Sequence, residues 1–313
     1  MQISVQTGGI IPYWGFEEGY RMIKEAGFDG LDWNIDSAWD RESLKDQLEN
    51  HELKHCVFEE PLEDIMAHYQ EELDVIHKYG LNLIQAHAPF PAYIEGFPEF
   101  NEYAIRIYRN CIRFCARAGI KYLVIHGASL RLNDYTQTPQ TIREMNRHLY
   151  ESLIPELKET DVVVCLENLF TRYKGSIVEG VCSNPDEAVS CLDELNEKAG
   201  KECFAFCLDT GHLNLLGKNQ GVFIRSLGSR IKALHIHDNW GDEDDHLAPY
   251  TGNIIWKDVV EALKEIQYAG SLNFETFQQV SLKRVDPEAV PVLLKMIYGI
   301  GDVFRRKITA GEK

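Results

Sequence analysis

The sequence predicts an α/β fold, a single (β/α)8 TIM barrel that spans residues 1–313. Eight short apolar segments with the length of β-strands alternate with segments of helical periodicity, and no linker rich in Pro, Ser or Gly separates them. In addition, His, Asp and Glu stand at the ends of several apolar segments, which is where parallel barrels carry their functional groups.

The first half of the chain alternates between strand and helix patterns. We expect strands at residues 2–6, 29–34, 82–87 and 122–126. We expect helices at 16–26, 62–79 and 100–118, each followed by a Gly that can stop it. Residues 36–60 are interpreted as an insertion after the second strand, with a helix near 41–50 and an extended piece at 53–58.

The second half continues the same alternation. We expect strands at residues 162–167, 204–209, 231–235 and 272–275. Helices are expected at 138–158, at 185–198 behind the start signal Asn184-Pro185, from Trp256 to Ile266, and at 287–305. A polar loop at 168–183 is expected to shape a pocket together with the insertion, and the polar tail from Lys307 is expected to fray.

The composition of the chain argues against membranes and nucleic acids as binding partners. The chain is 44% hydrophobic, but no stretch approaches the ~20 apolar residues of a membrane helix. Its amino terminus enters a strand pattern without a basic region or an apolar signal core, so we expect a cytoplasmic protein that does not bind membranes. The net charge of −17 disfavours nucleic acid, because binding to phosphates relies on Lys and Arg.

The eight cysteines lie mostly inside apolar strand or helix patterns, and no two of them form a CxxC pair. We expect reduced, buried thiols that pack as small hydrophobic groups.

Imidazole and carboxylate side chains end six of the eight predicted strands. The third and fourth strands end at His87 and His126, and the fifth ends at Glu167. The sixth ends at Asp209, with His212 one turn further. The seventh delivers His235 and also His237, and its loop adds Asp244 and His246. The eighth ends at Glu275. All of these side chains are expected to converge on one rim.

Glu167, Asp209 and Glu275 each follow an apolar run. A lone charge buried in such a place is costly and needs a cation or hydrogen-bond donors. Together with His235 they form an oxygen-rich set, which suits Mn²⁺ most, with Mg²⁺, Co²⁺ or Zn²⁺ as further candidates. We therefore expect a divalent metal at Glu167, Asp209, His235 and Glu275, with His246 and Asp244 as additional ligands.

Several motifs resemble the xylose isomerase-like TIM-barrel superfamily over nearly the whole chain. They are Leu-Glu-Asn at 166–168, Leu-Asp-Thr-Gly-His at 208–212, His-Ile-His-Asp-Asn at 235–239, the segment from His246 to Trp256, and Phe-Glu at 274–275. The superfamily holds sugar-phosphate isomerases and epimerases, ketose 3-epimerases, inosose dehydratase-like enzymes and endonuclease IV.

This resemblance implies that Glu167, Asp209, His235 and Glu275 match the shared metal ligands. It also implies that His212 matches a substrate contact of the ketose 3-epimerases. The chain matches the further positions that endonuclease IV uses for its zinc cluster, namely His87, His126, His212, Asp244 and His246.

The favoured hypothesis is a divalent-metal-dependent isomerase or epimerase that acts on a sugar, sugar phosphate or cyclitol. It would remove a proton next to a carbonyl bound by the metal. Glu167 and Glu275 are the expected catalytic acid and base. The expected substrate-binding residues are His212, His126, His87, Arg172, Trp33 and Tyr250.

Three alternatives stay open. A metal-dependent lyase, either an inosose-type dehydratase or a C-glycoside deglycosidase subunit, would share the first chemical step. An AP endonuclease similar to endonuclease IV would use the same ligands, but the expected rim loops carry many carboxylates. A non-catalytic sugar-binding barrel is the third. The expected partner is a small carbohydrate, and the chain is a candidate homo-oligomer.

Overall fold

Eight strands form one sheet. They are β1 (Ile3–Gln6), β2 (Gly30–Asn34), β3 (Asn82–His87), β4 (Tyr122–Val124), β5 (Val163–Glu167), β8 (Phe204–Asp209), β9 (Ile231–His235) and β10 (Leu272–Phe274). This computed structural model describes residues 1–35, 39–40, 43–94, 96–129 and 139–310, and orders the strands β10-β1-β2-β3-β4-β5-β8-β9. Parallel strands alternate with helices, which confirms the predicted (β/α)8 TIM barrel.

The chain divides into two compact units whose segments alternate along the sequence. The first unit comprises Met1–Trp33, Glu72–Gln85 and Phe206–Lys313, and the second comprises Asn34–Glu71 and Ala86–Ala205. The single domain expected over residues 1–313 stays a prediction.

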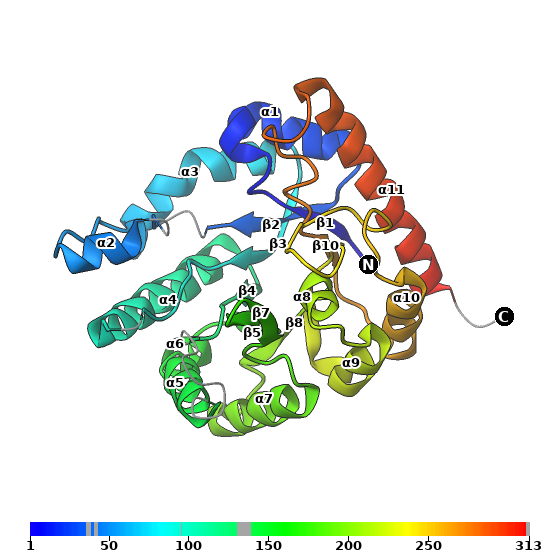
Figure 1. Ribbon diagram of the computed structural model, residues 1–313. Coiled ribbons are helices and arrows are strands. Elements are labelled where there is room, and N and C mark those ends of the chain that lie inside the picture. Colours follow the sequence, from blue (N-terminus) through cyan, green and yellow to red (C-terminus); the bar gives the residue numbers. More distant parts are fainter. Residues whose placement is uncertain (36–38, 41–42, 95, 130–138, 311–313) are drawn as a thin grey trace. The chain divides into compact units, whose positions relative to one another are not determined.

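In the first unit, strand pairing brings the ends of β8, β9 and β10 together. β1 lies between β10 and β2, with Ile3 opposite Leu272 (Figure 1). β8 pairs with β9 so that Asp209 lies opposite His235. A further bridge joins Ile236 to Phe274, and therefore the end of β9 meets the end of β10.

The helices of the first unit flank these strands. They are α1 (Ile11–Ala26), α8 (Thr210–Leu215), α9 (Gln220–Leu227), α10 (Trp256–Glu265) and α11 (Val290–Thr309), with 3₁₀ turns at Gly228–Arg230 and Pro287–Ala289. α1 packs beside α11, and α10 packs against both α9 and α11 (Figure 1). α1 starts five residues earlier than residue 16, because Pro12 suits a first turn and Gly15 (φ 69°) allows a kink. The expected fraying from Lys307 is wrong up to Thr309, where α11 ends.

The second unit contains strands β4 and β5 and most of the remaining helices. These are α2 (Leu44–Glu49), α4 (Pro98–Ala118), α5 (Pro139–Glu151), α6 (Ile154–Lys158) and α7 (Pro185–Ala199), while α3 (Leu62–Lys78) passes through both units. α7 begins as expected, because the Asn184 side chain accepts hydrogen bonds from the amides of Asp186 and Glu187.

Three sequence expectations in this unit are wrong. The expected polar loop 168–183 contains an antiparallel hairpin of β6 (Phe170–Tyr173) and β7 (Ser176–Glu179), which turns at Lys174-Gly175. The expected helix 138–158 is split before Pro155, and Thr138 lies outside the described residues. The expected extended piece 53–58 leads into a 3₁₀ turn at Val57–Glu59. Residues 36–38 of the insertion and 41–42 of its expected helix also lie outside the described residues.

Two expectations from composition can be compared with the structure. All eight cysteines are free thiols, and each is buried except Cys191, which is half-buried, so the prediction of reduced, buried thiols is confirmed. Among the helices within the described ranges, none is long and apolar enough to cross a membrane.

Neighbouring residues of β2 face opposite sides, as the twofold periodicity of a strand requires. The Trp33 side chain is only 1% exposed, and its indole N–H donates to Glu72 on α3 at 3.0 Å. Tyr20 donates a second hydrogen bond to the same carboxylate. Trp33 therefore packs between strand and helix, and its 1% exposure contradicts the expectation that it contacts a substrate.

Glu72 provides a first test of this packing. Burial raises the pKa of Glu72, although the hydrogen bonds from Tyr20 and Trp33 partly offset it. A raised folded-state pKa means that the carboxyl stabilises the fold less as pH rises above about 4.5. Glu72→Gln keeps an acceptor oxygen without the charge, so its stability relative to the wild type should increase between pH 4 and pH 7.

Glu72→Ala should instead lower the free energy of unfolding by about 2 kcal/mol, because two buried donors lose their acceptor. Urea denaturation of both variants at the two pH values measures these differences. Equal stability of the Ala and Gln variants would refute the role assigned to the hydrogen bonds.

Candidate metal centre

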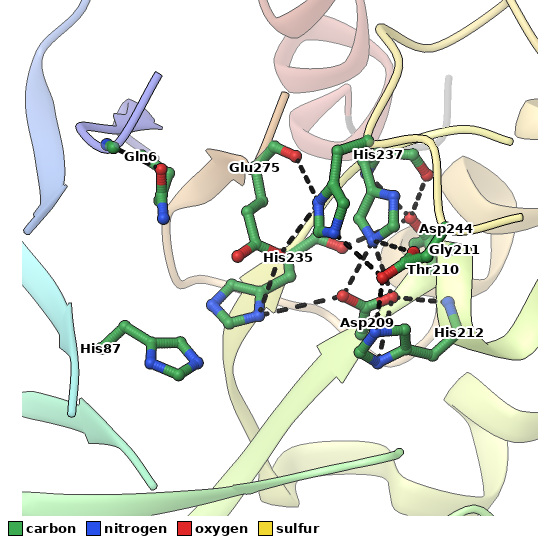
Figure 2. A network of polar contacts seen from close by, with 12 residues as sticks. Gln6, His87, Asp209, Thr210, Gly211, His212, His235, His237, Asp244 and Glu275 are labelled. Atoms are coloured by element: carbon green, nitrogen blue, oxygen red, sulfur yellow. Dashed lines mark hydrogen bonds and ion pairs between the residues drawn. The ribbon is translucent and has the colours of Figure 1, made fainter. Parts of the chain in front are cut away.

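Asp209, His235 and Glu275 point toward one another in the first unit (Figure 2). Nδ1 of His235 lies 3.9 Å from Oδ2 of Asp209 and 3.4 Å from Oε2 of Glu275. The Glu275 amide donates to the carbonyl of Ile236 at 3.1 Å, and this bond sets Glu275 beside the end of β9. All three side chains are buried, and one ligand atom from each lies within 4.8 Å of the others.

The opposite edge of the His235 ring faces a buried polar network. Nε2 of His235 lies 3.3 Å from Oδ2 of Asp32. The same carboxylate oxygen accepts hydrogen bonds from Gln85 at 3.0 Å and from Asn273 at 2.8 Å. A carboxylate behind an imidazole fixes the ring orientation and keeps the other nitrogen available to a metal. Sequence analysis missed Asp32, Gln85 and Asn273, although each is a polar residue inside an apolar strand.

His237 holds the carboxylate of Asp209 from the other side. Its Nε2 lies 3.0 Å and 2.9 Å from the two Asp209 oxygens, and the ring is fully buried. The ring packs so closely on Gly211 that a Cβ there would lie 1.9 Å from its Cε1. Burial lowers the pKa of His237 despite the nearby Asp209, so a neutral ring that donates one N–H is favoured.

The loop after β9 brings a second set of ligands beside Asp209. Nε2 of His246 lies 3.0 Å from Oδ2 of Asp244, and Nε2 of His212 lies 3.4 Å from the same oxygen. The His246 ring stacks on His237 with centroids 4.1 Å apart. Burial alone would lower the pKa of His246, but the carboxylates of Glu275 and Asp244 raise it to about 9.

Asp238 anchors this loop. Its Oδ1 accepts hydrogen bonds from the amides of Asn239 (3.0 Å) and Ile254 (3.1 Å). Its Oδ2 accepts from the Tyr250 amide (3.0 Å) and from the indole N–H of Trp256 (2.8 Å). Four donors around one buried carboxylate fix the segment that carries Asp244 and His246, a role that the sequence did not reveal.

The second unit gathers His87, His126 and Glu167. Nε2 of His126 lies 3.0 Å from Nε2 of His87 and 3.0 Å from Oε2 of Glu167. Nδ1 of His87 lies 2.8 Å from the carbonyl of Ala88, and it must donate because a carbonyl only accepts. The Phe90 ring packs on both imidazoles, with centroids 5.4 Å from His87 and 4.5 Å from His126.

The donor set around His235 fits a divalent cation. Asp209 and Glu275 are two buried carboxylates with closely spaced oxygens, and an isolated pair of such charges repels. A cation compensates that repulsion, and a mixture of carboxylate oxygens with one imidazole nitrogen suits Mn²⁺, Mg²⁺, Co²⁺ or Zn²⁺. The buried carboxylate behind His235 adds the outer support that such sites use.

Comparison with known proteins identifies the family of this chain. The sequence profile of the family described as xylose isomerase-like TIM barrel matches residues 20–295. The chain belongs to the xylose isomerase-like TIM-barrel family. An uncharacterised protein of Sinorhizobium fredii is 25% identical to this family member over 273 residues, which are 83% of this chain and 82% of that protein.

Two further similarities involve proteins whose names contain an activity. A D-psicose 3-epimerase of Enterocloster bolteae is 33% identical over 120 residues, which are 38% of this chain and 35% of that enzyme. The crystal structure of a D-tagatose 3-epimerase-like protein matches with a TM-score of 0.70 and 19% identity, and the match covers 99% of this chain and 100% of that one. The second similarity concerns the fold alone.

The remaining expected substrate residues of this xylose isomerase-like barrel, Arg172 and Tyr250, lie outside the eight barrel strands. Arg172 is exposed on β6, opposite Ile177. Tyr250 is 58% exposed, and its ring makes edge contacts with Trp256 of α10 and Phe304 of α11. A substrate contact at either residue stays a prediction.

Proposed function

We propose that this chain is a divalent-metal-dependent sugar epimerase or isomerase. The observation that carries the proposal is the buried convergence of Asp209, His235 and Glu275, with His235 supported by Asp32. It occurs in a member of the xylose isomerase-like family, and relatives with a named activity are D-psicose 3-epimerases. A small carbohydrate is the proposed substrate.

The proposed metal ligands are Glu167, Asp209, His235 and Glu275. Glu167 ends β5, and the carboxyl ends of barrel strands carry the active site in this fold. Mn²⁺ is the ion that we favour, with Mg²⁺, Co²⁺ or Zn²⁺ as substitutes. Asp244 and His246 are proposed as additional ligands, since both approach the Asp209 side of the site.

A divalent ion held by these residues would supply Lewis acidity, which would polarise a sugar carbonyl and make the adjacent C–H bond easier to ionise. Glu275 takes the proton from one face of that carbon, and Glu167 delivers a proton to the opposite face, so the configuration inverts. Delivery to the neighbouring carbon instead gives isomerisation. His212, His126, His87 and Arg172 are proposed to hold the substrate hydroxyls.

His237 is proposed to position Asp209. His237→Ala removes the N–H that holds both carboxylate oxygens, so the affinity of the metal-stripped protein for Mn²⁺ should fall about 10–100-fold. Calorimetric titration with Mn²⁺ measures the change. His237→Gln can place an N–H near the same oxygens and should recover most of the affinity, while the exposed His148→Ala should leave it unchanged. Wild-type affinity in His237→Ala would contradict the positioning role.

Two alternatives share parts of the site. A lyase would use the same proton abstraction and then expel a substituent. An endonuclease IV-like enzyme is favoured by the separate groups His87, His126, Glu167 and His237, Asp244, His246. The acidic net charge of −17 argues against DNA as the substrate.

Proton exchange tests the proposal directly. Ketoses, inososes and keto-glycosides are incubated with the Mn²⁺-loaded protein in heavy water, and deuterium incorporation is followed by NMR. We expect incorporation at one carbon beside the carbonyl, together with formation of the epimer or isomer. Incorporation followed by loss of water or of an aglycone would favour the lyase, and no incorporation on any compound would reject both functions.

A further inference from the structure

Gln6 ends β1 at the level of the proposed catalytic base. In the pairing of β1 with β10, Val5 lies opposite Phe274, and one further residue along each chain places Gln6 level with Glu275. Neighbouring strands lie about 4.8 Å apart, so the two residues are close. Both belong to the first unit, as does Asp32, which lies opposite Gln6 on β2.

The side chains of Gln6 and Glu275 point to the same side of the sheet. The Ser4 hydroxyl donates to Oδ1 of Asn273 at 2.9 Å, and Asn273 belongs to the polar network that faces His235. Because every second residue of a strand faces the same side, Gln6 points the same way as Ser4. Glu275 points the same way as Asn273 for the same reason. Figure 2 shows Gln6 directed to the region of Glu275 and His235.

The orientation of the Gln6 amide group is fixed by one hydrogen bond. The backbone N–H of Gly8 donates to Oε1 of Gln6 at 2.8 Å, and only the oxygen of an amide group can accept. The other branch is therefore Nε2, and no acceptor for it lies among the residues that the structure describes. The side chain is only 6% exposed. Two N–H donors are thus buried beside Glu275 without an acceptor, which is costly unless a ligand supplies one.

The turn that follows β1 is held in place. The carbonyl of Thr7 accepts hydrogen bonds from two backbone amides at the junction with α1, each at 3.0 Å. Gly9 packs so closely on the segment after β10 that a Cβ there would lie 2.7 Å from Cα of Phe277. The Gly8 amide is therefore fixed, and it holds the Gln6 amide group ready for a ligand.

The charges near Gln6 favour an uncharged oxygen as its acceptor. Asp32, Asp209 and Glu275 are three buried carboxylates around His235. One divalent ion would not compensate all three, so an anionic group of a substrate would be repelled. The neutral amide of Gln6 also lacks the positive charge with which Arg or Lys binds a phosphate. A sugar hydroxyl is an uncharged acceptor that fits these conditions.

We propose that Gln6 donates a hydrogen bond to one hydroxyl group of an uncharged sugar, close to the carbon from which Glu275 removes the proton. Gln6 is then a specificity-determining residue for the reaction. This inference rests on the proposed function and adds to it a substrate class, an uncharged sugar with a hydroxyl at that position.

The test is calorimetric titration of the Mn²⁺-loaded protein with D-fructose, D-tagatose, 2-keto-myo-inositol and methyl 3-keto-glucoside. The titration is repeated with monodeoxy analogues of the sugar that binds most tightly. Gln6→Met keeps the length of the side chain and removes both donors, so the affinity should fall about tenfold. The wild type should bind one analogue about tenfold more weakly than the parent sugar, whereas Gln6→Met should bind the two equally. Affinity for Mn²⁺ should not change, because Gln6 is not a proposed ligand.

Two further variants separate the donor from other effects. Gln6→Glu keeps an oxygen for the Gly8 amide but has no N–H, so it should lose the same discrimination while the turn stays supported. Gln2→Met makes the same replacement as Gln6→Met at an exposed position before β1, and it should bind every compound as the wild type does. Thermal melts check that the variants fold.

Wild-type sugar affinity in Gln6→Met would overturn the proposal. An equal loss of affinity for the parent sugar and for every deoxy analogue would also overturn it, because Gln6 would then act on the shape of the site and not on one hydroxyl. A wild type that neither binds any of the four compounds nor exchanges their protons would reject the proposed function itself, so the two failures are distinguishable.

Discussion

Glu275→Gln should lower the rate of substrate proton exchange by about 10³-fold, because the variant loses the carboxylate that takes up the proton. Gln keeps the size of the side chain and one oxygen for the metal. We therefore expect a fall in kcat with a much smaller change in KM. Exchange into solvent deuterium, measured by NMR at saturating Mn²⁺ and substrate, gives the rate.

The matched control is Glu261→Gln, which removes an exposed carboxylate on α10. It should exchange at the wild-type rate. Exchange by Glu275→Gln at the rate of the control would show that Glu275 is not the base. The acid/base assignment would then pass to another group.

Asp238→Ala should lower the free energy of unfolding by about 3 kcal/mol or more, since each buried donor left without an acceptor costs roughly 1–3 kcal/mol. Four donors, including the Trp256 indole and the Tyr250 amide, depend on this one carboxylate. Urea denaturation monitored by circular dichroism measures the loss. Binding of Mn²⁺ should weaken as well, because the loop that carries Asp244 and His246 loses its anchor.

Asp242→Ala is the control on the same loop. Asp242 is exposed and its side chain accepts one bond from the Glu243 amide. Its removal should change stability by less than about 0.5 kcal/mol. Similar stability losses in the two variants would mean that Asp238 does not organise the loop.

The strands and the candidate metal ligands were predictable from the sequence because the same pattern indicates both. An apolar run predicts a strand, and a carboxylate or imidazole at its end predicts a ligand. A carboxylate or imidazole at the end of an apolar run, as at Asp209, is costly to bury without a partner. The structure brings Asp209, His235 and Glu275 together as that argument expects. The assignment of the fourth ligand, Glu167, stays a prediction.

The error at Trp33 shows where single-sequence reasoning fails. Its neighbour Asp32 faces His235, so Trp33 must face the helices on the other side of β2. Aromatic character alone suggested a substrate contact, whereas the alternation along the strand excludes one. Asp32 and Asn273 were missed because the partner of a polar residue inside a strand cannot be identified until the strand register is known.

The hairpin Phe170–Glu179 was missed because its pattern is weak. Its residues are half-buried or exposed, and so they lack the apolar run that identified the barrel strands. Its turn residue Lys174 has a positive φ, which is uncommon without Gly or Asn and gives no sequence signal.

The most direct measurement is an anomalous scattering map from crystals of metal-stripped protein soaked in MnCl₂. We predict a manganese peak coordinated by Glu167, Asp209, His235 and Glu275, with Asp32 hydrogen-bonded to the far nitrogen of His235. A map with no manganese among these four side chains, and with their carboxylates in ion pairs with Lys or Arg instead, would contradict the proposed function.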